Sequence, residues 1–131
     1  AFLNPCEASY ARLGSFKAPR YITWSSENRS QLIRIPAAEG EFRRAELRSA
    51  DPMANPYIAF ALLIHAGLDG IKGRLNLPEP ADINLYTAPQ SVVDSSRRLP
   101  ASLTEAAAAA AKSEFIAEHL PEVVARAYFR H

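Results

Sequence analysis

Residues 42–48 read Phe-Arg-Arg-Ala-Glu-Leu-Arg, and from Arg44 onward charged and apolar side chains alternate. Side chains two residues apart lie on the same face of an extended chain. A strand here therefore carries Arg44, Glu46 and Arg48 on one face, while alanine and leucine lie on the other. This alternation predicts a strand that is half buried in a sheet.

Two segments upstream also predict strands. Residues 21–24 are Tyr-Ile-Thr-Trp, a β-branched and aromatic run. Residues 31–35 are Gln-Leu-Ile-Arg-Ile, and Pro36 stops them because proline cannot donate to a ladder. Together with residues 42–48 they predict a few antiparallel strands within about residues 18–50.

The remainder of the chain is expected to be helical. Asn-Pro at residues 55–56 suits the N-cap and first position of a helix over about residues 55–70. Residues 57–66 contain a single polar side chain, so this helix is expected to be buried on all sides. The glycines at 67 and 70 are its expected end.

The last third of the chain contains a second helical region. Residues 76–100 hold four prolines and little periodicity, which predicts an irregular connection. Ser-Leu-Thr-Glu at residues 102–105 matches a capping box, and the alanines that follow favour a helix to about residue 119. Pro121 begins a final short helix, so we expect helices over about residues 102–131.

The composition is that of an ordinary globular domain. The 131 residues hold 15 Lys and Arg against 14 Asp and Glu, a formal charge of +1, which disfavours a nucleic-acid-binding role. No apolar run reaches the roughly 18 residues of a membrane span, so no membrane partner and a cytoplasmic location are expected. The predicted fold class is α+β, with antiparallel strands followed by a buried helix and C-terminal helices. Because the chain opens without methionine, we expect a piece of a longer protein.

Arginine is concentrated at the start of the chain. Residues 1–48 hold eight Lys and Arg against five Asp and Glu, a net charge of +3. Guanidinium groups bind carboxylate and phosphate oxygens through two parallel hydrogen bonds. The alternative interpretation is that these arginines are solvated surface residues.

The stripe of Arg44, Glu46 and Arg48 is the strongest chemical signal. A carboxylate between two guanidinium groups is expected to stay ionised, because positive charge favours its charged form. Glu46 could then ligate a divalent cation while the arginines bind phosphate or carboxylate oxygens. The alternative is a solvent-facing strand that is stabilised by cross-strand ion pairs.

Eight short motifs occur in order along the chain. They are Ser-Tyr-Ala-Arg-Leu at 9–13, Ala-Pro at 18–19, Asn-Arg-Ser at 28–30, Ile-Arg-Ile-Pro at 33–36, Arg-Arg-Ala-Glu-Leu-Arg at 43–48, Asp-Pro-Met-Ala-Asn-Pro-Tyr at 51–57, Ala-Gly-Leu-Asp-Gly-Ile at 66–71 and Asn-Leu-Tyr at 84–86. Their order and spacing resemble the C-terminal part of the glutamine synthetase catalytic domain over nearly the whole chain, residues 1–131, with a weaker match after residue 100.

The resemblance implies a ligase that makes glutamine from glutamate, ammonia and ATP through an acyl phosphate. It implies Mg²⁺ or Mn²⁺ as cofactor and a ring-shaped homo-oligomer. In the family, most metal ligands and the main nucleotide pocket precede this region. The isolated 131 residues are therefore expected to be inactive without the N-terminal part of the protein.

The resemblance also assigns the binding of glutamate and phosphate. Arg12 would hold the α-carboxylate of glutamate, and Arg48 would face glutamate and the transferring phosphate. Arg29 and Arg34 would contact phosphate groups during transfer, which makes Arg29, Arg34 and Arg48 the implied catalytic residues.

The implied nucleotide and metal contacts overlap with this set. Arg29, Arg34 and Arg44 would bind the nucleotide. Glu46 would be the one metal ligand in this chain. The stripe identified from the alternation thus coincides with residues that the resemblance implicates, which favours a site over surface ion pairs.

Lys17 departs from the family pattern. The family has a glutamate there, in a loop that closes over the site and helps to bind and deprotonate ammonium. Since a cation cannot replace an anionic ammonium pocket, the alternatives are a γ-glutamyl–amine ligase with another amine, or an inactive anion-binding or nucleotide-binding paralogue. A third hypothesis is a helical interaction domain built on residues 106–111.

Overall fold

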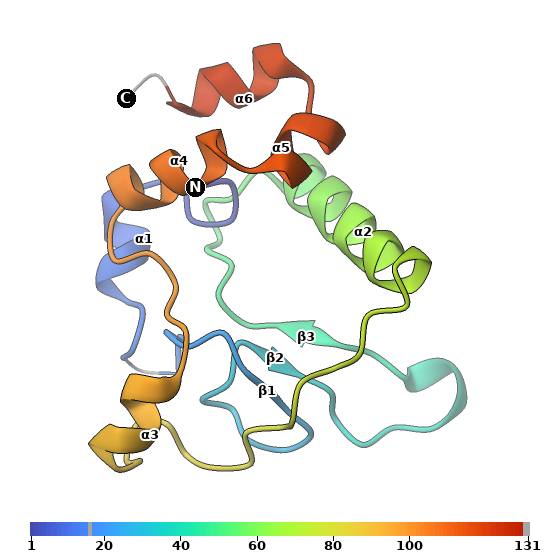
Figure 1. Ribbon diagram of the computed structural model, residues 1–131, viewed down its shortest axis with the longest axis vertical. Coiled ribbons are helices and arrows are strands. Elements are labelled where there is room, and N and C mark those ends of the chain that lie inside the picture. Colours follow the sequence, from blue (N-terminus) through green and yellow to red (C-terminus); the bar gives the residue numbers. More distant parts are fainter. Residues whose placement is uncertain (16, 130–131) are drawn as a thin grey trace. The chain divides into compact units, whose positions relative to one another are not determined.

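The computed structural model describes residues 1–15 and 17–129, which divide into two compact units (Figure 1). The first unit consists of Ala1–Ala11, Asp51–Leu77 and Pro100–His131, and the second of Arg12–Ala50 and Pro78–Leu99. Phe16 and the two C-terminal residues lie outside the described residues. Both strands and helices form, which confirms the α+β class.

Three short strands form the sheet of the second unit. They are β1 (Trp24–Ser25), β2 (Ile33–Arg34) and β3 (Glu46–Leu47), in the order β1-β2-β3 (Figure 1). β2 and β3 pair antiparallel as expected, but β1 and β2 run parallel, so the prediction of antiparallel strands is wrong for that pair.

The turn between β1 and β2 accounts for the parallel pairing. The Asn28 side chain accepts hydrogen bonds from the N–H and hydroxyl of Ser30, both at 2.9 Å, and the Asn28 N–H donates to the Ser25 hydroxyl at 2.9 Å. These side-chain bonds compete with hairpin pairing and return the chain in its original direction.

The predicted strands at 21–24 and 42–48 form only in part. Tyr21 pairs with Arg98 in an isolated antiparallel bridge, whereas Trp24 pairs with β2, so the first segment is divided between two partners. In the second segment the 3₁₀ helix η1 (Gly40–Phe42) precedes β3. Gly40 has φ 56°, a conformation that glycine adopts without a steric penalty.

The second unit is tied together by bonds between distant segments. The Ser30 hydroxyl accepts from the Leu85 N–H at 2.9 Å, and the fully buried Gln31 amide donates to the Ile83 carbonyl at 2.8 Å. The Trp24 indole N–H donates to the Pro78 carbonyl at 2.7 Å. Residues 78–99 therefore support the sheet rather than forming a loose connection.

The long helix α2 (Pro56–Lys72) begins as predicted and ends later. The Asn55 carbonyl oxygen of the side chain accepts from the N–H groups of Tyr57 and Ile58, which caps the helix. Gly67 and Gly70 lie inside the helix, so the predicted end was wrong, and Gly73 is the C-cap. The Gly73 N–H donates to the Asp69 carbonyl at 2.8 Å.

Within the described residues, this helix is buried on one side only and not on all sides. Leu62 is its one buried side chain, and it packs with Phe2 and Leu120 in the core of the first unit. Tyr57, which is 85% exposed, shows how open the other face is. Within the first unit, α2 packs against other residues on one side only, which leaves its remaining apolar side chains exposed. None of the described helices is long and apolar enough to cross a membrane.

The described residues form five further α-helices. They are α1 (Glu7–Ala11), α3 (Gln90–Ser95), α4 (Leu103–Ala111), α5 (Glu114–His119) and α6 (Glu122–Phe129). The predicted continuous helix to residue 119 is interrupted, because the Ser113 hydroxyl accepts from the Ile116 N–H and starts α5. The short helices α1 and α3 are not among the elements that the sequence predicts.

The capping box at the start of α4 forms as expected. The Ser102 hydroxyl accepts from the Glu105 N–H at 3.1 Å. The Glu105 carboxylate in turn accepts from the Ala101 N–H at 2.7 Å, one residue earlier than in the usual box. Two backbone donors that the helix cannot satisfy are thus bound.

Tyr10 makes the stability of the first unit sensitive to alkaline pH. Its side chain is 5% exposed and donates to the Asn4 carbonyl at 2.9 Å. Burial, reinforced by the charges of Glu7 and Cys6, raises the pKa of Tyr10 to about 12. The folded state retains this proton longer than the unfolded state does, so its stabilising effect is complete below about pH 10 and disappears as the pH rises through about 12.

We therefore expect the free energy of unfolding to fall between about pH 10 and 12, and Tyr10→Phe to make that fall shallower. At neutral pH the same variant costs about 1 kcal/mol through the lost hydrogen bond. Urea unfolding as a function of pH measures both effects, with the exposed Tyr57→Phe as the control. If the free energy of unfolding falls equally steeply in Tyr10→Phe, groups other than Tyr10 cause the alkaline loss of stability.

Candidate functional site

The centre of the candidate site is a bidentate pair between neighbouring strands. Arg34 on β2 lies directly opposite Glu46 on β3. The guanidinium donates from Nε to Oε2 at 2.9 Å and from Nη2 to Oε1 at 3.0 Å. The side chains are 16% and 31% exposed, so the pair is partly shielded from solvent. Two parallel bonds fix the direction of both groups.

Arg44 binds the same carboxylate from a position two residues earlier. Its Nε lies 3.3 Å from Glu46 Oε1, and its Nη1 donates to the Phe42 carbonyl at 3.3 Å. This contact agrees with the shared face that the alternation predicts. The hydrogen bond from Arg34, with a smaller contribution from Arg44, holds the pKa of Glu46 below its usual value although desolvation opposes the shift. Glu46 is therefore an ionised acceptor for two cations.

Arg48 follows β3 and is half-buried. Its backbone N–H donates to the Leu32 carbonyl at 2.9 Å. Its Nη1 is buried and has no hydrogen-bond partner within residues 1–15 and 17–129. A buried N–H without an acceptor is costly, and a carboxylate or phosphate oxygen would satisfy it. The charge of Arg48 also acts on Tyr86, where it opposes the rise in pKa that burial causes.

Arg12 connects a neighbouring loop to this cluster. Its guanidinium donates to the carbonyl of Ser49, the residue after Arg48. The Arg12 carbonyl accepts from the Ser15 N–H at 3.1 Å and from the Ser15 hydroxyl at 2.8 Å. Arg12 thus holds the start of the loop beside the cluster.

The loop itself is closed and carries Lys17. The Gly14 N–H donates to the Ala18 carbonyl at 2.8 Å, and Gly14 has φ 88°. Lys17 is exposed and has φ 114°, a conformation that side chains rarely adopt. Backbone strain of this kind persists where the surrounding structure requires it, often at functional sites.

Arg29 is an implied site residue that forms no bond to the cluster within the described residues. It is exposed in the turn between β1 and β2. No hydrogen bond or ion pair in the part of the chain that the structure describes joins it to Arg34, Arg44 or Glu46. Hydrogen bonds thus join Arg34 and Arg44 to Glu46, and Arg12 to the residue after Arg48. Within the described residues, no hydrogen bond or ion pair joins the side chain of Arg48 or of Arg29 to that carboxylate.

The residues present do not fit a divalent-metal site by themselves. Mg²⁺ requires near-octahedral oxygen coordination, whereas Glu46 is the one carboxylate in the cluster and both its oxygens bind guanidinium groups. Across the described residues, no group of three or more His, Cys, Asp or Glu side chains could hold a metal ion.

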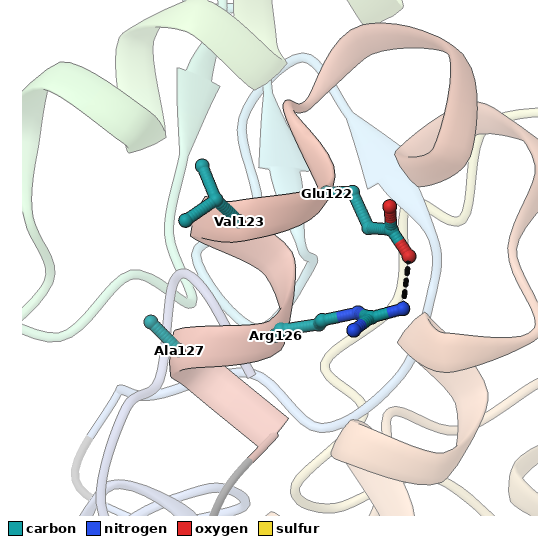
Figure 2. A pocket seen from close by; sticks show the side chains of 4 residues that line it. All are labelled: Glu122, Val123, Arg126 and Ala127. Carbon is teal, nitrogen blue, oxygen red and sulfur yellow. Dashed lines mark hydrogen bonds and ion pairs between the residues drawn. The ribbon is translucent and has the colours of Figure 1, made fainter.

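A hollow beside α6 is a weaker candidate. Its lining consists of Glu122, Val123, Arg126 and Ala127 (Figure 2). Arg126 donates to Glu122 one helical turn away, so the two charged side chains that line the hollow neutralise each other. Exposed ion pairs of this type contribute little to stability, and they leave no unpaired charge for a ligand.

Three features of the site are absent from the sequence predictions. Arg34 and Glu46 form its central pair, the Ser49 carbonyl accepts from Arg12, and Tyr86 is close enough for the charge of Arg48 to act on it. The strand register alone places Arg34 opposite Glu46. The backbone carbonyl of Ser49 leaves no signal in a side-chain pattern.

Comparisons with known proteins agree on one family. Residues 1–131 match the family described as glutamine synthetase, catalytic domain. Glutamine synthetase from Methanosarcina mazei is 46% identical over 127 residues, which cover 95% of this chain and 28% of that protein. Glutamine synthetase from Staphylococcus aureus strain MW2 is 53% identical over 87 residues, which cover 66% and 20%.

A solved structure shows the same similarity in three dimensions. It is that of GmaS in complex with ADP, with a TM-score of 0.80 and 33% sequence identity. The match covers 98% of this chain and 30% of that one. The chain thus spans less than a third of the length of these relatives.

Proposed function

Because the chain belongs to the glutamine synthetase catalytic-domain family, we propose that it is the C-terminal part of the catalytic domain of an ATP-dependent ligase that joins an amine to glutamate. The first candidate for the amine is ammonia, as in glutamine synthetase. The proposed reaction phosphorylates the γ-carboxylate of glutamate, and the amine then displaces phosphate.

The observation that carries this proposal is the bonded set of Arg34, Arg44 and Glu46, with Arg48 two residues after Glu46 in the chain. Phosphoryl transfer spreads negative charge over oxygens, so it depends on fixed positive groups in the correct positions. Glu46 fixes two of these guanidinium groups, and the buried Nη1 of Arg48 is available to an anionic oxygen. The second unit contains the whole set.

Each of these arginines has a proposed role in binding. Arg48 binds glutamate and the transferring phosphate through its unpartnered N–H. Arg12 binds the α-carboxylate of glutamate, for which it exchanges its bond to Ser49. Arg29 and Arg34 contact phosphate, and Arg44, whose side chain is 53% exposed, also lies against the nucleotide.

Glu46 is proposed as one metal ligand, but the chain does not complete the coordination shell. Mg²⁺ or Mn²⁺ would neutralise phosphate charge when bound. The other ligands, the main nucleotide pocket and the partner subunits of a ring are proposed to lie outside these 131 residues.

Lys17 supports a second candidate function. Its ammonium group cannot attract another ammonium ion, so a γ-glutamyl ligase that uses a different amine, or a paralogue that binds anions or nucleotides without turnover, is the alternative. Lys17 is exposed, and its loop is bound through Arg12 to the residue after Arg48, which supports both of these alternatives to ammonia ligation.

The test is the formation of γ-glutamyl hydroxamate from glutamate, ATP and hydroxylamine by the intact protein. We expect ATP-dependent hydroxamate formation and phosphate release. The isolated 131 residues are expected to form none, because Glu46 alone does not make a metal site. ATP binding without phosphate release in the intact protein would select the inactive paralogue instead.

A further inference from the structure

A second cationic surface lies in the same unit as the arginine cluster. Residues 20–22 pair with residues 97–99: the Leu99 N–H donates to the Arg20 carbonyl at 2.8 Å, and the Ile22 N–H donates to the Arg97 carbonyl at 2.9 Å. The bridge between Tyr21 and Arg98 is antiparallel. Side chains alternate in such a ribbon, so Arg20 and Arg97 share the face opposite Tyr21 and Arg98.

The two faces of this ribbon differ in charge compensation. The Arg98 guanidinium lies 5.6 Å from the centroid of the Tyr21 ring, and its Nη2 lies 3.3 Å from Asp94 Oδ1. Arg20 and Arg97 are exposed, and neither forms an ion pair within the described residues. One face is therefore neutralised, and the other presents uncompensated guanidinium groups.

Arg20 extends this cationic face to the loop that carries Lys17. A Cβ on Gly14 would lie 3.1 Å from Arg20 Nε, so the Arg20 side chain runs directly over that glycine. Residues 8–26 contain Arg12, Lys17 and Arg20 but no aspartate or glutamate. The loop and the ribbon thus form a surface of one sign.

The bond from Arg12 to Ser49 joins the start of the loop that carries Lys17 to the residue after Arg48. An ammonium ion that approached the cluster across this surface would meet the positive charges of Lys17 and Arg20. Glu46, the one carboxylate of the cluster, already binds two guanidinium groups. Like charges repel, so a simple cationic amine is disfavoured. A carboxylate or phosphate is the ligand that paired guanidinium groups recognise best.

We propose that the second substrate is an amine with its own anionic group, a carboxylate or a phosphate, which binds Arg20 and Lys17. This inference rests on the proposed ligase function. The unprotonated nitrogen attacks the γ-carbonyl carbon of γ-glutamyl phosphate and forms the C–N bond. The bond from that carbon to the phosphate oxygen breaks, orthophosphate leaves with the electron pair, and the nitrogen loses one proton to solvent.

Matched amines test the proposal in the intact protein. Glycine is compared with glycinamide, and phosphoethanolamine with ethanolamine, so each pair differs in the anionic group. Phosphate release and the mass of the γ-glutamyl product are measured. We expect kcat/KM to be about ten- to hundredfold higher for the anionic member of at least one pair, and the pair that responds distinguishes carboxylate from phosphate.

Substitutions locate the binding groups. Arg20→Gln and Lys17→Gln are each expected to lower kcat/KM for the preferred anionic amine, relative to hydroxylamine, by about ten- to hundredfold. Arg98→Gln removes the same charge from the opposite face of the ribbon and is expected to leave that ratio unchanged. If a variant does not fold, the matched amines decide alone.

Three results would overturn the inference. Equal kcat/KM within both amine pairs, together with hydroxamate formation, rejects the anionic substrate and leaves the ligase function standing. An equal effect of Arg20→Gln and Arg98→Gln rejects the proposed binding face. The absence of hydroxamate and of every γ-glutamyl product rejects the ligase function and this inference with it.

Discussion

Glu46→Gln is expected to lower kcat/KM of the intact protein by about 10²- to 10³-fold. The carboxylate accepts both bonds of the Arg34 fork and a third from Arg44. Glutamine has one acceptor oxygen, and its NH₂ group points donors at a guanidinium. Arg34 and Arg44 then lose their fixed positions opposite the transferring phosphate. Steady-state formation of γ-glutamyl hydroxamate measures the effect.

Glu41→Gln is the matched control for this variant. Glu41 lies in η1, is exposed, and is the same residue type a few positions upstream. Its substitution is expected to change kcat/KM by less than about twofold, as is usual for surface sites away from special contacts. If Glu46→Gln keeps wild-type activity, the cluster is a solvent-facing ion-pair network and not a site.

Arg48→Met is expected to separate activity from stability. Its loss should reduce kcat/KM by about 10²- to 10³-fold, because the variant has no donor for an anionic oxygen. The free energy of unfolding is expected to stay level or to rise by about 1–3 kcal/mol. The reason is that methionine removes a buried Nη1 that has no partner within the described residues. Phosphate release and urea unfolding measure the two quantities.

Arg43→Met provides the comparison, since Arg43 is an exposed arginine of the same segment. We expect both its activity and its free energy of unfolding to stay near the wild-type values, within about 0.5 kcal/mol for stability. A strong loss of stability in Arg48→Met with normal turnover would make Arg48 a structural residue and remove its proposed role in glutamate and phosphate binding.

The part of the site that the sequence predicts is the part that depends on local geometry. Alternation places Arg44 and Glu46 on one face, and the bond between them agrees with this. The partnership of Arg34 with Glu46 depends on the register of β2 against β3, which no local pattern contains. Arg29 illustrates the converse, because its motif does not reveal that its side chain is exposed and forms no bond to the cluster within the described residues.

Helix starts were easier to predict than helix ends and burial. Asn55 and Ser102 are recognisable because their side chains bond to the nearest N–H groups. The break at Ser113 was missed because alanine-rich sequence favours continuation, and the competing bond comes from a single hydroxyl. Burial of α2 depends on what packs against it, and the exposed Phe60 and Ile64 show that helix pattern alone does not supply a partner.

The division of the second unit into Arg12–Ala50 and Pro78–Leu99 sets an order of assembly during synthesis. The pair of Arg34 and Glu46 can close as soon as β3 has left the ribosome. The buried Gln31 amide and the Ser30 hydroxyl must wait for Ile83 and Leu85. Contacts this far apart in sequence form slowly, since the intervening chain must first be ordered. A nascent chain whose residues 78–99 are still inside the ribosome therefore displays its arginines on an unfinished support, and we expect this unit to be most sensitive to proteases until Ile83 and Leu85 have emerged.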